Sequence, residues 1–530
     1  MSVDLLTRTP AALKKPVIAG CALVYLAMAL WFWHQDLVPG DSVSRAANAY
    51  YTLFSRDPHL AAIGFVWNPL PSLILMPFLP LGRLVPALTQ QGLLVVLVSA
   101  ALMTFTVAVT HDVLRRSDVP RVARLVLTGA FALHPMIVIY SGNGMSEAGF
   151  LLCLMLAVRA LLIWLVDGRP ESLVPLGLAV GLAYGARYEA LAPVAAVPVL
   201  VFLTTFWRTP KDRPRKALAR TDAVIAGLPG VLAVILWALA GKLIVGQWFA
   251  TFSSQYGNSA QVSANATGIG SVTGDDLPGR IDYWLQQMAG LSPLFVVILV
   301  AALVLAWRRR DPRVLAPCTV LGSVLAFDGL AFLSGTSFGW LRFHITVIPL
   351  TILLAGHLIA ALPRPAAADR DRRRTTAVTV GVLAMVLVAI PSTLVTLNRP
   401  TLAREESEWL TADGAARTRG LTRVNRQVAA DLDALALPEG AVLTDAAYAF
   451  GIILASDRPR QFVITPDRDF AEVVADPAGH GVRYLLLSAQ GAADAVRIAR
   501  FGPDPSSVPA TGVRTWRDAK GGLQWTLVPV

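Results

Sequence analysis

The sequence predicts an α-helical protein that crosses a membrane many times and ends in a small α/β domain. Hydrophobic residues make up 55% of the chain and charged residues only 15%, whereas soluble domains carry about a quarter charged residues. The mean hydropathy is +0.57, and the apolar runs are about 17–25 residues long, which is the length of a spanning helix. After residue 398 the charge density becomes that of a soluble domain. We therefore expect a membrane part at 17–397 and a separate domain at 398–530.

The first apolar run covers residues 17–33 and follows Lys14 and Lys15. A signal peptide begins in the same way, but here the aromatic sequence WFWH at 31–34 stands where a small-residue cleavage site would be. We expect an uncleaved span with an aromatic belt at its far end, preceded by a cytoplasmic tail at residues 1–16.

Basic residues gather in the connections between later apolar runs, which is the positive-inside pattern of membrane proteins. This pattern explains the net charge of +11 without a nucleic-acid partner. The basic clusters lie at 115–124, 208–216, 308–310 and 370–374. Placing them in the cytoplasm predicts a multi-pass protein with a cytoplasmic N-terminus and an extracytoplasmic C-terminal domain. The length criterion predicts about eleven spans, near 17–35, 93–112, 122–141, 148–166, 173–186, 190–207, 222–245, 292–307, 314–334, 345–362 and 376–397.

The segment 36–92 is expected to be a long outer loop. If residues 69–88 within it crossed the membrane, the basic residues on its two sides could not all face the cytoplasm. Prolines also interrupt helical hydrogen bonding there. We expect 69–88 to be a re-entrant or juxtamembrane segment, and irregular backbone is tolerated at membrane depth only where it lines a cavity. The loop is thus predicted to form the rim of a site.

Residues 398–530 combine strand-like and helical patterns. Short apolar runs predict buried strands at 440–445, 460–465, 482–488 and 523–530, and an amphipathic run predicts a helix at 423–435. This mixture indicates a small α/β domain.

Asp41 is the strongest catalytic candidate. It follows the first span and precedes a predicted amphipathic helix. A partly desolvated carboxylate at a membrane rim can have a raised pKa and accept a proton from a hydroxyl nucleophile. The alternative is that Asp41 only caps a helix that begins at Ser42.

Cations on the predicted outer side are candidates for binding an anion. Arg342 and His344 lie where a span meets the outer surface, and Arg187 and Lys242 fall on the same side. Several outward cations beside a cavity suggest an anionic ligand, for which a lipid phosphate is suited. The alternative for Arg342 is snorkelling at the interface.

Further polar residues follow the same outer face. Ser146 and Glu147 begin a span, where a cap and an acid in the first turn are also ordinary helix chemistry. Tyr188 and Glu189 stand beside Arg187, and an Arg–Glu pair that fixes a tight turn is an equally good reading.

No motif of an ATPase, a zinc hydrolase or a serine hydrolase is present. The three cysteines lie in apolar runs and indicate packing rather than disulfides. No cofactor is required by any motif, and a divalent cation is left open.

The order of these features resembles the GT-C glycosyltransferases, membrane enzymes that take sugars from polyprenyl phosphates, such as the aminoarabinose transferases and protein O-mannosyltransferases. Three stretches between residues 17 and 362 carry the resemblance. They are Asp41, Tyr50 and Tyr51 with WNPLP at 67–71, then GLAYGARYEAL at 181–191, then WLRFHITVIP at 340–349. This chain has Asp41-Ser42 where the family often has Asp-Glu, which weakens the case for a metal-assisted mechanism.

The resemblance implies an inverting glycosyltransferase of the plasma (inner) membrane. It would move a sugar from a polyprenyl-phosphate donor to a cell-envelope acceptor, which is a glycan, a lipid or a protein. Arabinosyl- and mannosyltransferases of actinobacterial envelopes are similar in carrying an appended soluble domain. The implied catalytic residue is Asp41, and the implied ligands of the donor phosphate are Arg342, His344, Arg187 and Lys242. The implied substrate-binding residues are Tyr50, Tyr51, Trp67, Asn68, Tyr188, Glu189 and Glu147.

Two functions of other classes stay open. A flippase or transporter of lipid-linked sugars also needs a lateral cavity and outward cations, but its polar sites usually lie near the midplane, where this chain has few charges. A non-catalytic scaffold that binds envelope glycan through its C-terminal domain is the second alternative.

The C-terminal domain is expected to roof the cavity opposite the loop at 40–78, because only a short polar connection joins it to the last span. In this position it would help to hold the acceptor. Asp445, Asp467 and Asp469 are expected to be turn residues or sugar contacts rather than catalysts.

Overall fold

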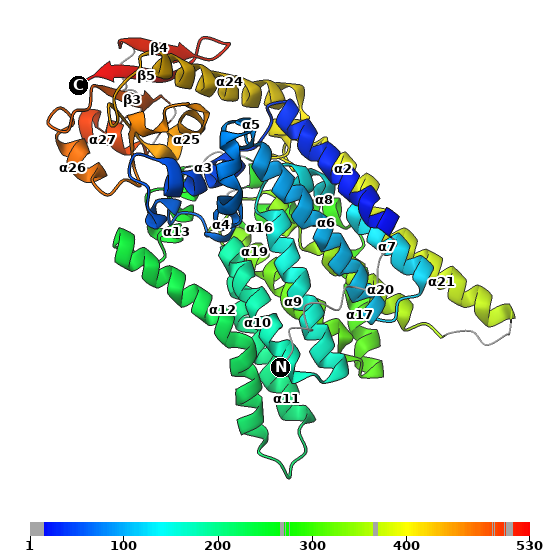
Figure 1. The fold of residues 1–530 in the computed structure, drawn as a ribbon. Coiled ribbons are helices and arrows are strands. Elements are labelled where there is room, and N and C mark those ends of the chain that lie inside the picture. The colour runs from blue at the N-terminus through cyan, green and yellow to red at the C-terminus, as the bar shows by residue number, and fades with distance from the viewer. Residues whose placement is uncertain are drawn as a thin grey trace.

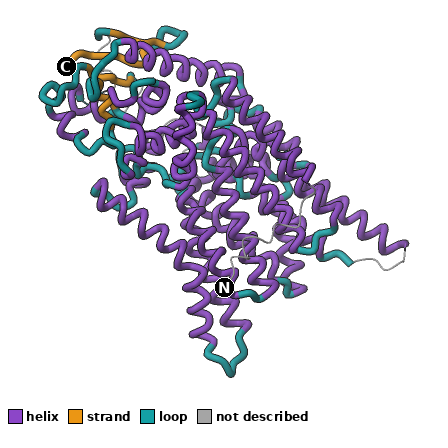
Figure 2. The backbone as a smooth tube through the Cα atoms, in the orientation of Figure 1, coloured by secondary structure: helices purple, strands orange, loops and turns teal. Residues whose placement is uncertain are grey.

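The computed structural model describes residues 15–264, 270, 272–274, 276–363, 369–489, 491, 493–502, 504 and 512–530. Nearly all of the expected N-terminal tail, residues 1–14, lies outside this part. A bundle of long helices forms most of the molecule, and a small mixed sheet lies at one end of it (Figure 1). Figure 2 shows the strands gathered at that single corner. The end of the bundle that carries the sheet is called the sheet side below.

Within the described residues, eight helical segments are long and apolar enough to cross a membrane: Pro16–His34, Leu93–Arg116, Glu147–Asp167, Tyr188–Arg208, Arg215–Val245, Pro312–Leu333, Leu341–Ala360 and Arg372–Leu397. Two bent helix pairs raise the number to ten if each pair is one span. The remaining expected span, at 173–186, forms a helix of 14 residues. This helix is shorter than the roughly 20 residues that a straight span needs.

The helices of these segments have the following bounds: α2 (Lys15–His34), α6 (Leu93–Arg116), α9 (Glu147–Asp167), η3 (Pro170–Ser172), α10 (Leu173–Ala186), η4 (Tyr188–Ala190), α11 (Leu191–Arg208), α12 (Arg215–Val245), η5 (Pro312–Val314), α18 (Leu315–Pro317), the π-helical turn η6 (Cys318–Gly322), α19 (Ser323–Leu333), η7 (Leu341–His344), α20 (Val347–Ala360), α21 (Asp369–Leu387) and α22 (Ala389–Leu397). In the span formed by η7 and α20, 89% of the apolar window is buried, against 22% in α12. The former is therefore a central helix, and α12 presents its leucine and isoleucine side chains outward, as expected of a helix that faces lipid.

The two bent pairs break at prolines. Helix α7 (Arg121–Ala132) meets α8 (Pro135–Gly142) at an angle of 56°, and α16 (Leu277–Leu291) meets α17 (Phe295–Arg309) at 78°. Pro135 begins α8 and Pro293 lies in the second break. Proline removes a backbone donor and its ring clashes with the preceding turn, so both bends have a local cause.

The segment between α2 and α6 contains only short helices: α3 (Gly40–Phe54), η1 (Leu60–Ile63), α4 (Leu70–Leu75), η2 (Met76–Arg83) and α5 (Ala87–Gln90). The apolar stretch Leu70–Arg83 is shorter than the 18 residues required of a span. Prolines at 69, 71, 77, 80 and 86 keep it broken. A second irregular connection on the sheet side contains α13 (Ala250–Ser253) and α14 (Asn258–Ala264).

The C-terminal part begins with α23 (Ser407–Leu410) and α24 (Ala412–Ala434) and then alternates strands and helices. Its further elements are β1 (Val442–Thr444), α25 (Ala446–Ala455), η8 (Pro459–Gln461), β2 (Phe462–Ile464), α26 (Phe470–Ala475), β3 (Tyr484–Ser488), α27 (Ala495–Phe501), β4 (Arg514–Arg517) and β5 (Leu523–Pro529). The strand order is β2-β1-β3-β5-β4. Strand β1 is parallel to β2 and β3, whereas β5 is antiparallel to β3 and β4. Each expected strand is present, and the unexpected β4 is a four-residue edge strand with little apolar signal.

Ion pairs hold the C-terminal part against the segment that follows α2. Arg56 donates to Asp467 at 3.0 Å, and Arg468 donates to Asp57 at 3.0 Å. Farther along, Arg426 pairs with Asp36 at 2.7 Å. The sheet is thereby placed over α3, in the position expected from the short connection.

Candidate active site

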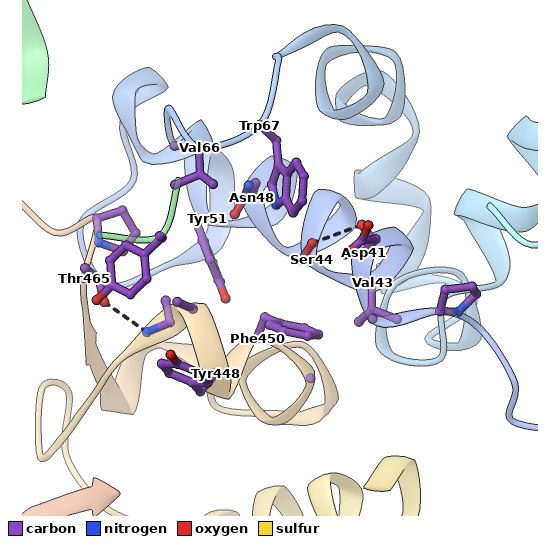
Figure 3. Close-up of a pocket in the computed structure, with 18 of the residues that line it drawn as sticks. Asp41, Val43, Ser44, Asn48, Tyr51, Val66, Trp67, Tyr448, Phe450 and Thr465 are labelled. Carbon is purple, nitrogen blue, oxygen red and sulfur yellow. Dashed lines mark hydrogen bonds between the residues drawn. The ribbon is translucent and has the colours of Figure 1, made fainter. Parts of the chain in front are cut away.

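A cavity of about 1980 Å³ lies on the sheet side, between the bundle and the C-terminal part. Helix α3 and the connection at 244–261 line it from the bundle, and α24 and α25 line it from the C-terminal part. Figure 3 shows α3 and α25 facing each other across this space, with Asp41, Tyr51 and Trp67 on one side and Tyr448 and Phe450 on the other. The cavity is large enough for substrates of several groups.

Asp41 lies on the wall of this cavity, in the first turn of α3. The helix begins at Gly40, two residues before Ser42, and its N-cap position is Pro39 without a side-chain cap bond. The capping alternative for Asp41 is therefore wrong. Its carboxylate instead accepts a hydrogen bond from Arg342 at 3.2 Å, while 30% of the side chain stays exposed.

The charge state of Asp41 also differs from the expectation. Burial raises the pKa of Asp41, but the nearby guanidinium groups of Arg342, Arg45 and Arg187 lower it more, and the net pKa lies below the ordinary value. The expected raised pKa is thus wrong, because the sequence did not show how many cations surround this carboxylate. Asp41 is an ionised carboxylate in contact with the cavity.

Arg342 is the centre of an ion cluster, of which Asp41 and Glu405 line the cavity. It is buried and contacts three carboxylates: Asp41 at 3.2 Å, Glu405 at 3.0 Å and Glu147 at 3.7 Å. Its guanidinium also lies over the ring of Trp340 at 4.7 Å. A buried arginine needs such partners, because its desolvation is costly. The position of Arg342 is therefore not that of a snorkelling residue.

Arg187 extends this cluster. It pairs with Glu147 and with Glu189, and both carboxylates are buried. The interpretation of Arg187 and Glu189 as a pair that fixes a turn is consistent with this geometry, since Arg187 is the N-cap of the short helix η4 and Glu189 lies within it. Glu147 joins the two arginines, so the chain of ion pairs runs from Asp41 through Arg342, Glu147 and Arg187 to Glu189.

None of the four expected phosphate ligands is among the described residues that line the cavity. Arg342 and Arg187 belong to the ion cluster, whereas Lys242 and His344 do not. Lys242 is near the end of α12, where its Nζ donates to the carbonyl of Gly246 at 3.1 Å in an exposed position. His344 is buried, neither ring nitrogen has a hydrogen-bond partner in the described part of the chain, and the ring stands edge-on to Trp284 at 6.3 Å.

The expected substrate-binding aromatic residues divide into two groups. Tyr51 and Trp67 line the cavity. Tyr50 instead packs against Phe54 with ring centroids 4.9 Å apart.

Asn68 and Tyr188 also lie away from the residues that line the cavity in the described structure. The Asn68 side chain donates to the carbonyl of Tyr184 at 2.6 Å. The Tyr188 ring packs edge-on against Phe252 at 5.0 Å. Both contacts are those of structural residues.

Sequence reasoning missed two acids that follow the last apolar helix. Glu405 lines the cavity and pairs with Arg342, and Tyr140 donates to Glu406 at 2.7 Å. Burial raises the pKa of Glu405 well above the ordinary value, although Arg342 opposes this rise. The sequence signal that could have identified Glu405 and Glu406 is that two adjacent acids follow the last span, on the same predicted side as Asp41.

Arg45 is the second residue whose position the sequence did not reveal. It is buried, its Nη1 donates to the backbone carbonyl of Asp41 at 3.0 Å, and its guanidinium lies 4.8 Å from the ring centroid of Trp67. Among the described residues, no carboxylate forms an ion pair with it. Arg45 also lines a small groove of about 30 Å³, whose other wall residues come mainly from α4, α6 and the segment 144–149 and are mostly apolar.

In the described ranges of the chain, no three His, Cys, Asp or Glu side chains are arranged to hold a metal ion.

No family model and no curated protein matches this sequence. The fold is similar over 97% of this chain to two solved structures from Archaeoglobus fulgidus, of which it covers 74% each at 11% identity. One is the crystal structure of the oligosaccharyltransferase tethered with an acceptor peptide containing the NVT sequon via a disulfide bond, with a TM-score of 0.45. The other is the archaeal oligosaccharyltransferase AglB in complex with an inhibitory peptide and a dolichol-phosphate, with a TM-score of 0.44.

Proposed function

We propose that the protein is an inverting glycosyltransferase of the plasma (inner) membrane that moves a sugar from a polyprenyl-phosphate donor to a hydroxyl group of an extracytoplasmic acceptor. One observation carries the proposal. The carboxylate of Asp41 lines the large cavity, and the buried Arg45, which donates to the backbone carbonyl of Asp41, lines a small groove with mostly apolar walls. A carboxylate open to a large cavity beside a buried cation and apolar walls suits a reaction between a lipid-linked sugar and a water-soluble acceptor.

The proposed step needs one base and one anion-binding group. The acceptor oxygen attacks the anomeric carbon of the donor sugar, and a new glycosidic bond forms from the side opposite the phosphate. The bond between the anomeric carbon and the phosphate oxygen breaks with its electron pair on the phosphate, which leaves as polyprenyl phosphate. The proton of the acceptor hydroxyl passes to Asp41. The configuration at the anomeric carbon is inverted.

The contacts of the arginines suggest how the roles divide. Arg342 and Arg187 already contact carboxylates on several sides, so their main role in the proposal is to hold Asp41 and Glu147 in place. Arg45 has no ion-pair partner and adjoins the groove, which makes it the preferred ligand of the donor phosphate. This shifts the expected phosphate site from Arg342 and Arg187 to Arg45.

Glu405 is a second candidate for the base. It lines the same cavity and shares Arg342 with Asp41. Its raised pKa makes it a stronger base than Asp41 once it is ionised, whereas the lowered pKa of Asp41 keeps that group ionised at neutral pH. Comparing the Asp41→Asn and Glu405→Gln variants decides which of the two carboxylates is the base.

The test uses the purified full chain, a synthetic polyprenyl-phosphate sugar and an envelope extract as the acceptor source. Release of polyprenyl phosphate is measured for the wild type, Asp41→Asn and Glu405→Gln. We expect Asp41→Asn to lower the rate by about 10²–10⁴-fold, the usual contribution of a general base. Near-normal turnover of Asp41→Asn would refute its assignment as the base. Sugar transport without release of polyprenyl phosphate would support a flippase, and glycan binding without either would support a scaffold.

A further inference from the structure

The parallel strands of the C-terminal part end at the cavity. Strand β1 pairs in parallel with both β2 and β3, so the carboxyl ends of all three meet at one edge. The chain passes from β1 to β2 on one side and then returns to β3 on the other side of β1. Ligands of open α/β sheets bind outside the carboxyl ends of the strands at such a reversal. Tyr448, Thr465 and Asp467, which follow these strands, all line the cavity.

Most acids at this edge are used by the fold itself. Asp445 accepts hydrogen bonds from the backbone of Ala447 and Ala495, at 2.9 and 2.8 Å, and also from Tyr256 and Thr465. Asp494 accepts from two backbone N–H groups. These two carboxylates cap helices and join loops, so their oxygens are already used by the fold.

Three polar atoms that border the cavity at this edge, in contrast, form no hydrogen bonds with the described part of the fold. The hydroxyl of Tyr51, the hydroxyl of Ser254 and Oδ1 of Asp467 are buried, and each lacks a hydrogen-bond partner among the described residues. Tyr51 is only 1% exposed. Figure 3 shows its side chain pointing from α3 toward Tyr448 and Thr465. A buried polar group without a partner is costly, so a ligand that supplies partners would be favoured here.

The chemistry of the three atoms indicates what such a ligand carries. Two hydroxyls both donate and accept, and a carboxylate oxygen accepts, which suits the hydroxyl groups of a sugar. Aromatic rings of Tyr448 and Phe450 border the same space. The carboxylates of Asp445 and Asp467 make this edge unsuitable for an anionic ligand. A neutral polyhydroxyl compound fits best.

The distance from Asp41 indicates the size of this ligand. Asp41 and Tyr51 are ten positions apart on the single helix α3, and a rise of 1.5 Å per residue separates their backbones by about 15 Å. One sugar unit at Asp41 does not reach Tyr51. A ligand that contacts both must be an extended chain.

We propose that the carboxyl edge of β1 and β2, together with Tyr51 and Ser254, is a subsite that binds the hydroxyl groups of a neutral oligosaccharide, distant from the bond-forming position at Asp41. Calling this oligosaccharide the acceptor rests on the proposed function. The binding site itself does not, because it is defined by atoms outside the ion cluster around Arg342.

The experiment measures binding without any donor, so its failure is distinguishable from failure of the glycosyltransferase assignment. Full-length protein in detergent micelles is titrated with linear tetrasaccharides of mannose, arabinofuranose or glucose and with the matching methyl monosaccharides, and binding is followed by saturation-transfer NMR. We expect at least one tetrasaccharide to bind, more tightly than its monosaccharide. Tyr51→Phe and Ser254→Ala should each weaken it by about 3- to 10-fold, the usual effect of one lost hydrogen bond.

Tyr484→Phe is the matched control, because Tyr484 lies at the opposite, amino end of β3 and should bind as the wild type does. Ser254→Ala removes a hydroxyl that has no partner in the free protein, so it tests the subsite even if Tyr51→Phe folds poorly. The proposal is overturned if no tetrasaccharide binds, or if Tyr51→Phe and Ser254→Ala bind as the wild type. It is also overturned if a neutral tetrapeptide binds in their place with the same dependence on Tyr51.

Discussion

Replacing Arg342 tests whether the ion cluster is a single unit. Arg342 is buried and contacts Asp41, Glu147 and Glu405, so Arg342→Gln leaves three carboxylates close together without their shared cation. Removing one partner of a buried ion pair costs about 3–5 kcal/mol, because the remaining charge is uncompensated. We expect Arg342→Gln to lower the free energy of unfolding by about this amount and to abolish sugar transfer.

The assay is denaturant unfolding of the full chain in mixed micelles, combined with release of polyprenyl phosphate. The double variant Arg342→Gln with Glu405→Gln removes one of the stranded charges, so it should recover part of the lost stability without recovering activity. Arg417→Gln, on the exposed face of α24, is the matched control and should stay within about 0.5 kcal/mol of the wild type. If Arg342→Gln is as stable as this control, or if the second substitution lowers stability further, the reasoning about the cluster is wrong.

Further predictions concern the donor, the pH and the domain contact. Arg45→Gln should weaken binding of polyprenyl phosphate at least tenfold, because charge-assisted hydrogen bonds contribute about 1.5–3 kcal/mol. Unchanged binding would exclude Arg45 as the residue that binds the phosphate. Burial raises the pKa of Asp467 and of Asp494 to about 6. Because both folded values lie above the ordinary value, the contribution of these groups to stability is present below about pH 4 and is lost as the pH rises to about 6. The loss is at most about 3 kcal/mol for each group. Asp467→Asn should therefore show a smaller decline over this range than the wild type, and an identical pH profile in unfolding experiments would contradict the shift. The hydrogen bonds from Arg468 lower the pKa of Asp57 to about 2, so the stability from this contact is present above about pH 4 and is lost as the pH falls through 2. Because the Arg468 side chain is 74% exposed, Arg468→Gln should leave the thermal unfolding temperature close to that of the wild type. A large drop in that temperature would show that this contact does more than hold the surface.

Much of the membrane part was predictable because the bilayer imposes a length. Apolar runs at 93–112 and 148–166 become α6 and α9 with nearly the expected bounds. The run at 173–186 was counted as a span on apolarity alone, although its helix has 14 residues. The bends at Pro135 and Pro293 could have been expected from proline, but their angles depend on packing.

Single residues of the candidate site, such as Asp41, Tyr51 and Trp67, could be named from the sequence, but their contacts could not. Hydropathy and charge predicted Asp41 and Arg342 on the same side of the membrane, yet 301 positions separate the two partners of that hydrogen bond. No local pattern pairs residues so far apart. The capping alternative for Asp41 failed for a related reason, since a cap is a local contact and Arg342 is a distant one that competes with it.

The expected phosphate site shows what sidedness cannot decide. From the sequence, all cations on the predicted outer side were equally good candidates for binding a phosphate. The structure distinguishes them by whether each one already has a carboxylate partner. Lys242 is exposed, Arg342 and Arg187 are already paired with buried acids, and Arg45 is buried without an ion pair beside the apolar groove. A buried cation is costly unless charged or polar groups compensate it. Arg342 and Arg187 form ion pairs with protein carboxylates, whereas Arg45 interacts with Asp41 electrostatically but forms no ion pair with a described residue. This difference makes Arg45 the residue to test first for donor binding.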